Sequence, residues 1–404
     1  MEVLDTEIDI VVPYGCTVHG EEEIAAVVSV LKSSTQMGRH VHEMEQKVSA
    51  LFAKKHGIMV NSGSSANHLA TEILNLPAGS EVITPVLTFG TTVAPIVKNQ
   101  LIPSFVDVEE NTFNIDVARI DEMINDNTRA MLIPNLLGNL PDWKFIRDLA
   151  NQYNLILIED SADTIGAAIN DLPTGYYSDI TTTSFYGSHV INCAGNGGML
   201  CVNDANLADR AKLLRSWGRS SSLYNESEAI ENRFNIEVDD IPYDAKFIFE
   251  AIGYNFEPSE MGAAFGLVQL GKLAHNIRLR EKHFKQHLEF FRQYQEWLIL
   301  PQPLINSRTS WLAFPLIVRD CAPFTRTQLQ IFFEKHRIHT RTVFSGNILR
   351  QPGYAKIRRR ESARGYPNAD QVMRGGILLG CHHGLNDQMI SHMHESFELF
   401  VSHY

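Results

Sequence analysis

The sequence contains few cysteines and no cysteine motif. Five cysteines occur among 404 residues, and no two of them form a Cys-x-x-Cys pair. Disulfide frameworks and structural zinc sites depend on closely spaced cysteines. We therefore expect neither of these in the protein, and we expect no other metal site.

The sequence also lacks long apolar runs and an excess of basic residues. No apolar run approaches the ~18 residues of a membrane span, and the acidic N-terminal residues contain no apolar signal-peptide core. Acidic residues outnumber basic ones, 47 to 35, for a net charge of −12, which disfavours binding to nucleic acid. We expect a cytoplasmic protein that binds neither membranes nor nucleic acid.

The length and composition are those of a soluble globular protein with two domains. Hydrophobic residues make up 44% and charged residues 20% of the chain, and 404 residues exceed what one simple core holds. We place the large domain at residues 1–275 and the smaller one at residues 276–404. The polar segment 216–243 has little periodicity and is expected to be an excursion from the fold. Periodicity further predicts helices at residues 20–33, 42–53, 116–124, 143–152, 203–215, 273–298, 325–336 and 387–401, and a strand at residues 338–343.

Residues 182–198 combine a strand end, a histidine and a glycine cluster. A β-prone run leads to Ser184, His189 follows, and Gly195, Gly197 and Gly198 come before a second apolar run. The glycines allow a tight turn with close backbone approach. A serine at a strand end can bind an anion, and an imidazole can exchange protons near neutral pH. The pattern indicates a strand, a functional loop and a second strand, although a histidine can also simply fill a core position.

A second motif, Asn61-Ser-Gly-Ser-Ser-Ala-Asn67, lies between an apolar strand and a helix. Free backbone N–H groups and the helix dipole make such a helix N-terminus a ready anion site. The same residues also cap ordinary helices, so the motif alone is weak evidence for a ligand.

A third motif is the apolar run Leu155-Ile-Leu-Ile-Glu-Asp160. A run of this kind is typical of a strand buried on both faces, with functional groups at its carboxyl end. A carboxylate there is costly unless a cation or a hydrogen-bond donor pairs with it. Asp160 is therefore a candidate ligand-binding residue, and the alternative is a helix N-cap.

Together with Gly253-Tyr-Asn255, these motifs resemble the sugar aminotransferases of the DegT/DnrJ/EryC1/StrS type, which bind pyridoxal phosphate (PLP). The resemblance spans roughly residues 10–400. Those enzymes carry Ser-Phe-x-x-x-Lys, and the lysine forms a Schiff base with the cofactor. Here His189 takes the lysine position, as in the subgroup of NDP-4-keto-6-deoxyhexose 3-dehydratases similar to GDP-4-keto-6-deoxymannose 3-dehydratase. The resemblance implies the α/β fold of type I PLP enzymes, with a mostly parallel central sheet flanked by helices and a smaller C-terminal α+β domain.

The resemblance also implies roles for individual residues. His189 would be the catalytic base, and Asp160 would pair with the pyridine nitrogen and hold it protonated. Asp163 would lie near the cofactor and Phe89 would stack on its ring. Gly63, Ser64, Ser65 and Ser184 would hold the cofactor phosphate, with Asn255 supplied by the partner subunit of a homodimer that shares its active sites, and Arg341, Asn347 and Arg350 would meet the substrate.

The implied function is 3-dehydration of a nucleotide-linked 4-keto-6-deoxyhexose, a lyase reaction that gives a 3,6-dideoxy sugar. Imidazole cannot form an imine, so PLP or pyridoxamine phosphate (PMP) would bind noncovalently, and L-glutamate would donate the amino group that regenerates PMP. Some of the resembling dehydratases hold a [2Fe–2S] cluster by cysteines just after Gly-Arg. Here serines follow Arg219 and no cysteine occurs between Cys201 and Cys321, so we expect no cluster.

Two alternatives to dehydration stay open from the sequence. One is a sugar aminotransferase that works without the lysine, and the other is an inactive PLP-fold protein that binds or regulates a partner. Asn196 departs from the family pattern, because an acidic residue usually stands between the glycines there.

Overall fold

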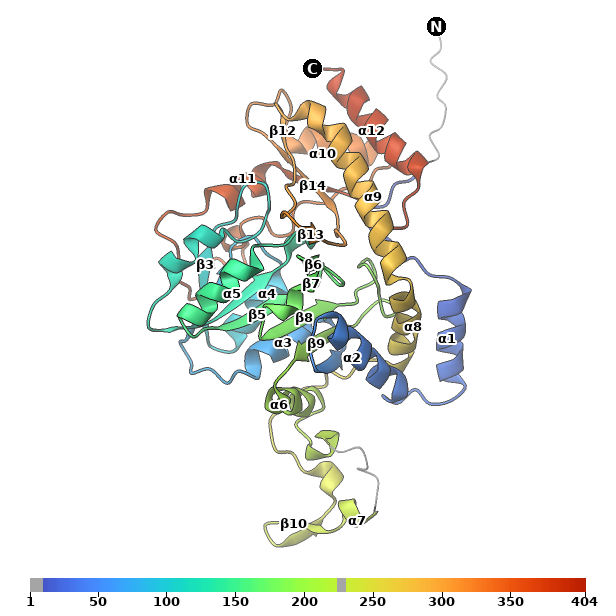
Figure 1. The fold of residues 1–404 in the computed structure, drawn as a ribbon, viewed down its shortest axis with the longest axis vertical. Coiled ribbons are helices and arrows are strands. Elements are labelled where there is room, and N and C mark those ends of the chain that lie inside the picture. The colour runs from blue at the N-terminus through green and yellow to red at the C-terminus, as the bar shows by residue number, and fades with distance from the viewer. Residues whose placement is uncertain (1–9, 224–229) are drawn as a thin grey trace.

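A seven-stranded sheet forms the centre of the N-terminal part of the chain. The computed structural model describes residues 10–223 and 230–404, and the strand order is β1-β9-β8-β5-β4-β2-β3. Strands β8, β5, β4, β2 and β3 are parallel, whereas β9 is antiparallel to both of its neighbours. The predicted mostly parallel α/β sheet is therefore confirmed (Figure 1). The strands are β1 (His56–Val60), β2 (Glu81–Pro85), β3 (Ile102–Val106), β4 (Thr128–Pro134), β5 (Ile156–Asp160), β8 (Ile180–Ser184) and β9 (Gly198–Val202).

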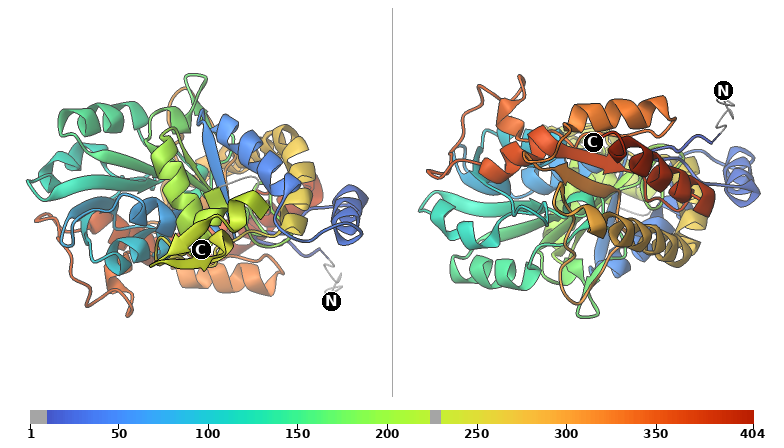
Figure 2. Two further views of the ribbon diagram at one scale, coloured as in Figure 1. Left: turned by 90° about the horizontal axis from the view of Figure 1, so that it is seen from below. Right: turned by 90° about the horizontal axis from the view of Figure 1, so that it is seen from above.

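Helices cover both faces of this sheet, as the wholly apolar strands require. Successive side chains of β4 point to opposite faces. Ala130 and Leu132 pack in the cluster that includes α3 and α6, whereas Met131 and Ile133 pack in the cluster that includes α5. Figure 2 (left) shows α5 on one side of the sheet and α3 and α4 on the other. The helices are α1 (Glu21–Leu31), α2 (Arg39–Leu51), α3 (Gly63–Glu72), α4 (Gly90–Lys98), α5 (Trp143–Gln152), α6 (Ala205–Arg215) and α8 (Glu260–Gly271).

The C-terminal part has its own three-stranded antiparallel sheet, in the order β12-β14-β15. The expected boundary at residue 275 falls inside α9, which continues without a break from Leu273 to Phe291. A buried cluster joins the two parts, because Val86 and Leu87 pack with Ile317 and Leu378. The elements here are β12 (Leu298–Ile299), β14 (Phe314–Val318), β15 (Gly376–Leu379), α10 (Arg326–Lys335), α11 (Pro367–Gly375) and α12 (Asp387–Val401), and a small sheet joins β6 (Ala168–Ile169), β7 (Leu172–Pro173) and β13 (Ser307–Arg308).

Two of the expected elements are wrong. Residues 116–124 form two short 3₁₀ turns, Val117–Arg119 and Asp121–Met123, since the side chain of Asp116 caps the first turn at Ala118 and polar turn formers follow. Residues 338–343 form no regular strand, because Ile338 pairs with Val12 while Arg341 pairs with Leu378. Each of these pairings is a single bridge.

The expected excursion is an arm that projects from the large sheet. Strands β10 (Ile236–Val238) and β11 (Ile241–Tyr243) form its two-stranded tip, and the turn residues Asp239 and Asp240 both have positive φ, as tight hairpins favour. Residues 224–229 of the excursion lie outside the described residues. The arm extends at the bottom of Figure 1, away from the sheets. Across both described ranges, no helix is long and apolar enough to cross a membrane.

Trp143 links the core to the carboxyl end of the sheet. Its side chain is fully buried, and its Nε1 donates to Asn135 Oδ1 over 2.7 Å. We predict that Trp143→Phe lowers the free energy of unfolding by about 2–3 kcal/mol, through lost volume and an unsatisfied amide oxygen. Phe145, on the same helix, is 45% exposed, so Phe145→Leu serves as the control. Equal urea midpoints for the two variants would contradict the prediction.

Candidate active site

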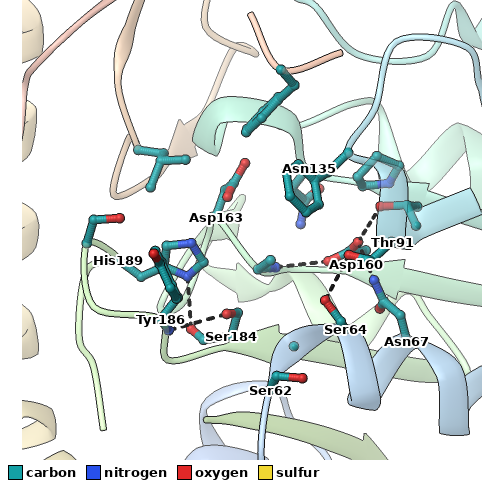
Figure 3. Close-up of a pocket in the computed structure, with 18 of the residues that line it drawn as sticks. Ser62, Ser64, Asn67, Thr91, Asn135, Asp160, Asp163, Ser184, Tyr186 and His189 are labelled. Atoms are coloured by element: carbon teal, nitrogen blue, oxygen red, sulfur yellow. Dashed lines mark hydrogen bonds between the residues drawn. The ribbon is translucent and has the colours of Figure 1, made fainter. Parts of the chain in front are cut away.

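A cavity of about 540 Å³ opens at the carboxyl ends of β5 and β8. Most of the predicted site residues line it, namely Gly63, Ser64, Phe89, Asp160, Asp163, Ser184 and His189 (Figure 3). They come from four chain segments that the parallel sheet brings to one edge, which is where α/β proteins bind ligands.

The floor of the cavity is the N-terminus of α3. Ser62 caps the helix by accepting a hydrogen bond from Ser65 N at 3.1 Å. A Cβ atom on Gly63 would lie 2.6 Å from Ser184 Cβ, so the backbone passes the strand end at a distance that only glycine allows. Ser64 Oγ donates to Thr91 Oγ1 of the next helix at 2.9 Å. Together these groups form a cradle for an anion at a helix N-terminus.

Ser65 does not share this cradle. Its Oγ donates to Asn61 Oδ1 over 2.6 Å, and the residue lines another recess of about 230 Å³, which shares Ser64 and Thr91 with the cavity. The structure therefore brings together Gly63, Ser64 and Ser184, and it places the side chain of Ser65 elsewhere.

Asp160 is a buried carboxylate held by neutral donors. Its Oδ2 accepts from Asn67 Nδ2 at 2.7 Å and from Thr92 Oγ1 at 2.9 Å, and its Oδ1 accepts from Ala162 N at 3.1 Å. Burial raises the pKa of Asp160, and these three hydrogen bonds only partly offset that effect. A cationic N–H donor in the cavity would complete the pairing of this charge.

Asp163 is a second acid of the same cavity. Its Oδ2 accepts from Leu137 N at 2.9 Å. Burial first, and the neighbouring charge of Asp160 second, raise the pKa of Asp163 to about 7. The two carboxyl groups together can therefore hold or release a proton near neutral pH.

His189 is a half-buried imidazole whose tautomer the backbone defines. Its Nδ1 lies 3.2 Å from the carbonyl oxygen of Ser184, and a carbonyl only accepts, so Nδ1 carries the hydrogen. Figure 3 shows the other ring nitrogen on the far side from this bond, toward the cavity. Burial lowers the pKa of His189 to about 4. The imidazole is thus a neutral base with an available Nε2.

Aromatic side chains form the walls of the cavity. Phe89 lies at the N-cap of α4 and is 55% exposed, and its ring meets Phe344 edge-on at 6.0 Å. Tyr14 and Tyr186 also line the cavity. An exposed phenyl ring at the mouth of a cavity offers a flat surface to a planar ligand.

Besides Ser65, four more predicted residues lie outside this cavity. Asn255 is exposed on the far side of Asn61, whose side chain contacts the Asn255 carbonyl. Arg341 lines a second cavity of about 540 Å³ that shares Tyr14, Tyr186 and Ser188 with the first. Asn347 and Arg350 both donate to Asp370, and neither residue lines either cavity.

Sequence reasoning did not single out several residues that shape the site. Asn67 and Thr92 hold Asp160, and both stand in motifs that already carried predicted residues, four and three positions beyond Gly63 and Phe89 respectively. One helical turn of spacing could have found them. Tyr14 comes from the distant N-terminal segment, for which the sequence holds no local signal. Asn196, the departure from the family pattern, also lines the cavity.

The donor set fits a ligand with an anion at one end and a protonated ring nitrogen at the other. The cradle at Gly63 and Ser64 suits a phosphate, Asp160 suits a pyridinium N–H, and Phe89 suits a flat ring. Within the described part of the chain, no group of three or more His, Cys, Asp or Glu side chains could hold a metal ion.

Comparison with known proteins agrees with this geometry. Residues 17–398 match the model of the DegT/DnrJ/EryC1/StrS aminotransferase family. The dTDP-4-dehydro-2,6-dideoxy-D-glucose 3-dehydratase of Saccharopolyspora spinosa is 33% identical, over 96% of this chain and 86% of that protein.

Two solved structures share the fold. Escherichia coli GDP-4-keto-6-deoxy-D-mannose-3-dehydratase with bound hydrated PLP has a TM-score of 0.86 at 28% identity, and the match covers 96% of this chain and 100% of that one. A mutant of GDP-4-keto-6-deoxymannose-3-dehydratase with bound GDP-perosamine has the same TM-score and identity, over 95% and 99% of the two chains. The expected fold of type I PLP enzymes is therefore confirmed.

The paired carboxyl groups give a test that needs no ligand. We predict that the Asp163 carboxyl titrates with an apparent pKa near 7, and that Asp160→Asn lowers this pKa because it removes the neighbouring negative charge. The carboxyl ¹³C resonance of Asp163, identified by its loss in Asp163→Asn, reports the titration. Asp148→Asn, at an exposed ion pair, is the control that should leave it unchanged. An unaltered pKa in Asp160→Asn would refute the coupling.

The raised pKa of Asp163 also makes the stability of the folded protein depend on pH. The pKa of Asp163 lies above its ordinary value of 3.8, so the folded chain binds more protons than the unfolded chain between about pH 4 and pH 7. The contribution of Asp163 to the free energy of unfolding therefore falls as the pH rises through this window. We predict that Asp163→Asn weakens the dependence of the free energy of unfolding on pH between about pH 4 and pH 7.

Proposed function

The chain belongs to the DegT/DnrJ/EryC1/StrS aminotransferase family, and we propose that it is a PMP-dependent 3-dehydratase of a nucleotide-linked 4-keto-6-deoxyhexose. The observation that carries this proposal is His189, a neutral imidazole at the position where family members that bind PLP covalently have a lysine. Among the described residues that line the cavity, none is a lysine. The cofactor is therefore held without a covalent bond.

The residues present fit that cofactor. Gly63, Ser64 and Ser184 would hold the phosphate, Asp160 would pair with the pyridine nitrogen and Phe89 would cover the ring. When bound, PMP supplies an amine for the sugar carbonyl and a ring that accepts electrons. Support for this assignment comes from the relative that was solved with bound hydrated PLP.

The protein's own part in the reaction is proton transfer at His189. The Ser184 carbonyl fixes the hydrogen on Nδ1, so Nε2 takes a proton and later returns it. The lowered pKa leaves His189 unprotonated at neutral pH and so able to accept a proton. Asp163, with a pKa of about 7, adds a second group that exchanges protons in the same cavity.

The second cavity is the proposed site of the nucleotide diphosphate. Arg341 and His339 line it, and no Asp or Glu is among its described lining residues. An uncompensated guanidinium suits a diphosphate. The cavities share Tyr14, Tyr186 and Ser188, so one substrate can reach from the diphosphate site to His189. Asn347 and Arg350 would act indirectly, since both contact Asp370.

L-Glutamate is the proposed amino donor.

A homodimer would complete the site. Asn255 is exposed and lies outside the cavity of its own chain, as expected if it serves the phosphate of the partner subunit. The projecting arm carries exposed apolar side chains, including Phe234, Ile241 and Phe249. Solvent-exposed apolar patches of this kind commonly mark an interface.

His189 variants test the reaction. With PMP and a panel of 4-keto-6-deoxy sugar nucleotides, the wild type should release a product that has lost its carbon-3 oxygen. His189→Asn should bind PMP but react about 100- to 10,000-fold more slowly, because the general base is gone, whereas the exposed His42→Asn should match the wild type. His189→Lys should retain PLP after borohydride reduction.

Other outcomes distinguish the alternatives. A product with nitrogen at carbon 4 would identify an aminotransferase, and no turnover of any sugar, with no exchange between PLP and glutamate, would identify an inactive binding protein. Dehydration by His189→Asn at the wild-type rate would refute His189 as the base.

Mixed dimers test the shared site. We predict that His189→Asn and Asn255→Ala are each impaired alone, and that mixing them after dissociation regains about a quarter of wild-type activity, because half of a random mixture consists of dimers with one intact site. Each variant mixed with itself is the control. No regain of activity, with mixed dimers verified by mass spectrometry, would contradict a site shared between subunits.

A further inference from the structure

Arg280 is a buried cation without an anionic partner in contact. It lies on α9, and its side chain is fully buried. Its hydrogen bonds go to neutral acceptors, and over residues 10–223 and 230–404 no Asp or Glu oxygen forms an ion pair with it. Burying an unpaired charge costs stability, and an apolar residue of similar size would avoid that cost. A function other than packing would therefore explain why a charged residue stands at this position.

The acceptors of Arg280 belong to two walls of the first cavity. Nη1 donates to the carbonyl oxygens of Trp311 at 2.9 Å and Leu312 at 3.2 Å, and Leu312 lines the cavity. Nη2 lies 3.5 Å from the carbonyl of Ser188, the residue directly before His189. One guanidinium thus bridges the loop that carries the imidazole and the wall of the cavity at Leu312.

The wall at Trp311 needs this support. Trp311 has a φ of +37°, a left-handed conformation that is strained for a bulky residue. Two successive carbonyls there turn toward the same guanidinium nitrogen. Nε of Arg280 meets His383 Nδ1 at 3.2 Å. The planar guanidinium group of arginine has several N–H donors and can bond these separate acceptors at once, whereas the single ammonium group of lysine cannot.

The charge of Arg280 also acts on the groups around His189. The titratable neighbours that share the cavity are Tyr14, Asp160, Asp163 and Tyr186. Burial lowers the pKa of His189 most, the hydrogen bond to Ser184 opposes this effect, and the charge of Arg280 adds a smaller lowering. The same charge opposes the rise in the pKa of Asp163.

The groups that accept hydrogen bonds from Arg280 are neutral, and Asp163 is a carboxyl group whose charge also acts on it. Tyr14, Cys16 and Cys381 lie near Arg280, and burial raises the pKa of each. His383 stays unprotonated because burial lowers its pKa to about 3. Among the described residues, no carboxylate forms a direct ion pair with the guanidinium, so its charge acts on the cavity at longer range.

We propose that Arg280 is the positioning residue of His189: it ties the backbone before the imidazole to the wall of the cavity at Leu312 and brings its positive charge near the imidazole. This inference rests on the proposed function only in taking His189 as the base.

Two variants separate the charge of Arg280 from the several N–H donors of its guanidinium group. Arg280→Met removes both, and Arg280→Lys keeps the charge alone. The His189 imidazole is titrated by NMR in the full-length, cofactor-free chain, with its resonance assigned by its loss in His189→Asn. We expect the pKa of His189 to rise by about 1 unit in Arg280→Met and to stay near the wild-type value in Arg280→Lys. In turnover, Arg280→Lys should lower kcat about tenfold with little change in KM, because the base is less well placed.

Arg215→Met is the matched control, because Arg215 is also buried but bonds Glu45 and the Met59 carbonyl away from the cavity. It should lower the melting temperature without moving the His189 titration. If Arg280→Met does not fold, Arg280→Gln replaces it in the titration.

An unchanged pKa of His189 in the uncharged variant would overturn the electrostatic part of the proposal, and a wild-type kcat in Arg280→Lys would overturn the positioning part. Because the titration needs neither cofactor nor substrate, its result stands even if the protein proves not to be a dehydratase.

Discussion

The hydrogen bonds to the buried carboxylate of Asp160 are the interactions on which the rest of the site depends. Asn67 and Thr92, which donate to it, belong to α3 and α4, so the same bonds fix the helix N-termini that bear Ser64 and Thr91. The anion cradle and the negative charge are thus built as one unit at the end of β5. The three donors are neutral and only partly offset the effect of burial on the carboxylate, so a cationic N–H donor in the cavity would complete its pairing.

The exchange of lysine for histidine changes what the neighbouring loop can do. An imidazole offers two nitrogens, and the carbonyl of Ser184 occupies one of them, which leaves the other for proton transfer. The side chain of Ser184 faces the cradle beside Gly63. One residue at the end of β8 therefore serves the anion site with its side chain and the base with its backbone. In the proposed function, this coupling would let the site hold a phosphate and orient the imidazole without a covalent bond to a cofactor.

Local motifs predicted the sheet and most of the cavity, because each motif joins the end of a strand to the loop or helix that directly follows it. Asp160, Gly63 and His189 could be found in this way. The direction of the Ser65 side chain could not, since it depends on Asn61 in the folded turn. Asn347 and Arg350 contact Asp370, a partner 20 or more residues away. Arg280 gave no signal at all, because in sequence it is one of several basic residues of an amphipathic helix, and its acceptors lie 31 to 103 residues away. Tertiary contacts of this kind have no periodicity to reveal them.

The most direct measurement is a single turnover by protein loaded with one equivalent of PMP, without glutamate, on a 4-keto-6-deoxy sugar nucleotide, followed by mass spectrometry of the sugar. The account predicts a product that has lost its carbon-3 oxygen and kept an oxygen at carbon 4, because a neutral imidazole at position 189 supports elimination. A product that keeps the carbon-3 oxygen and carries nitrogen at carbon 4 would contradict it.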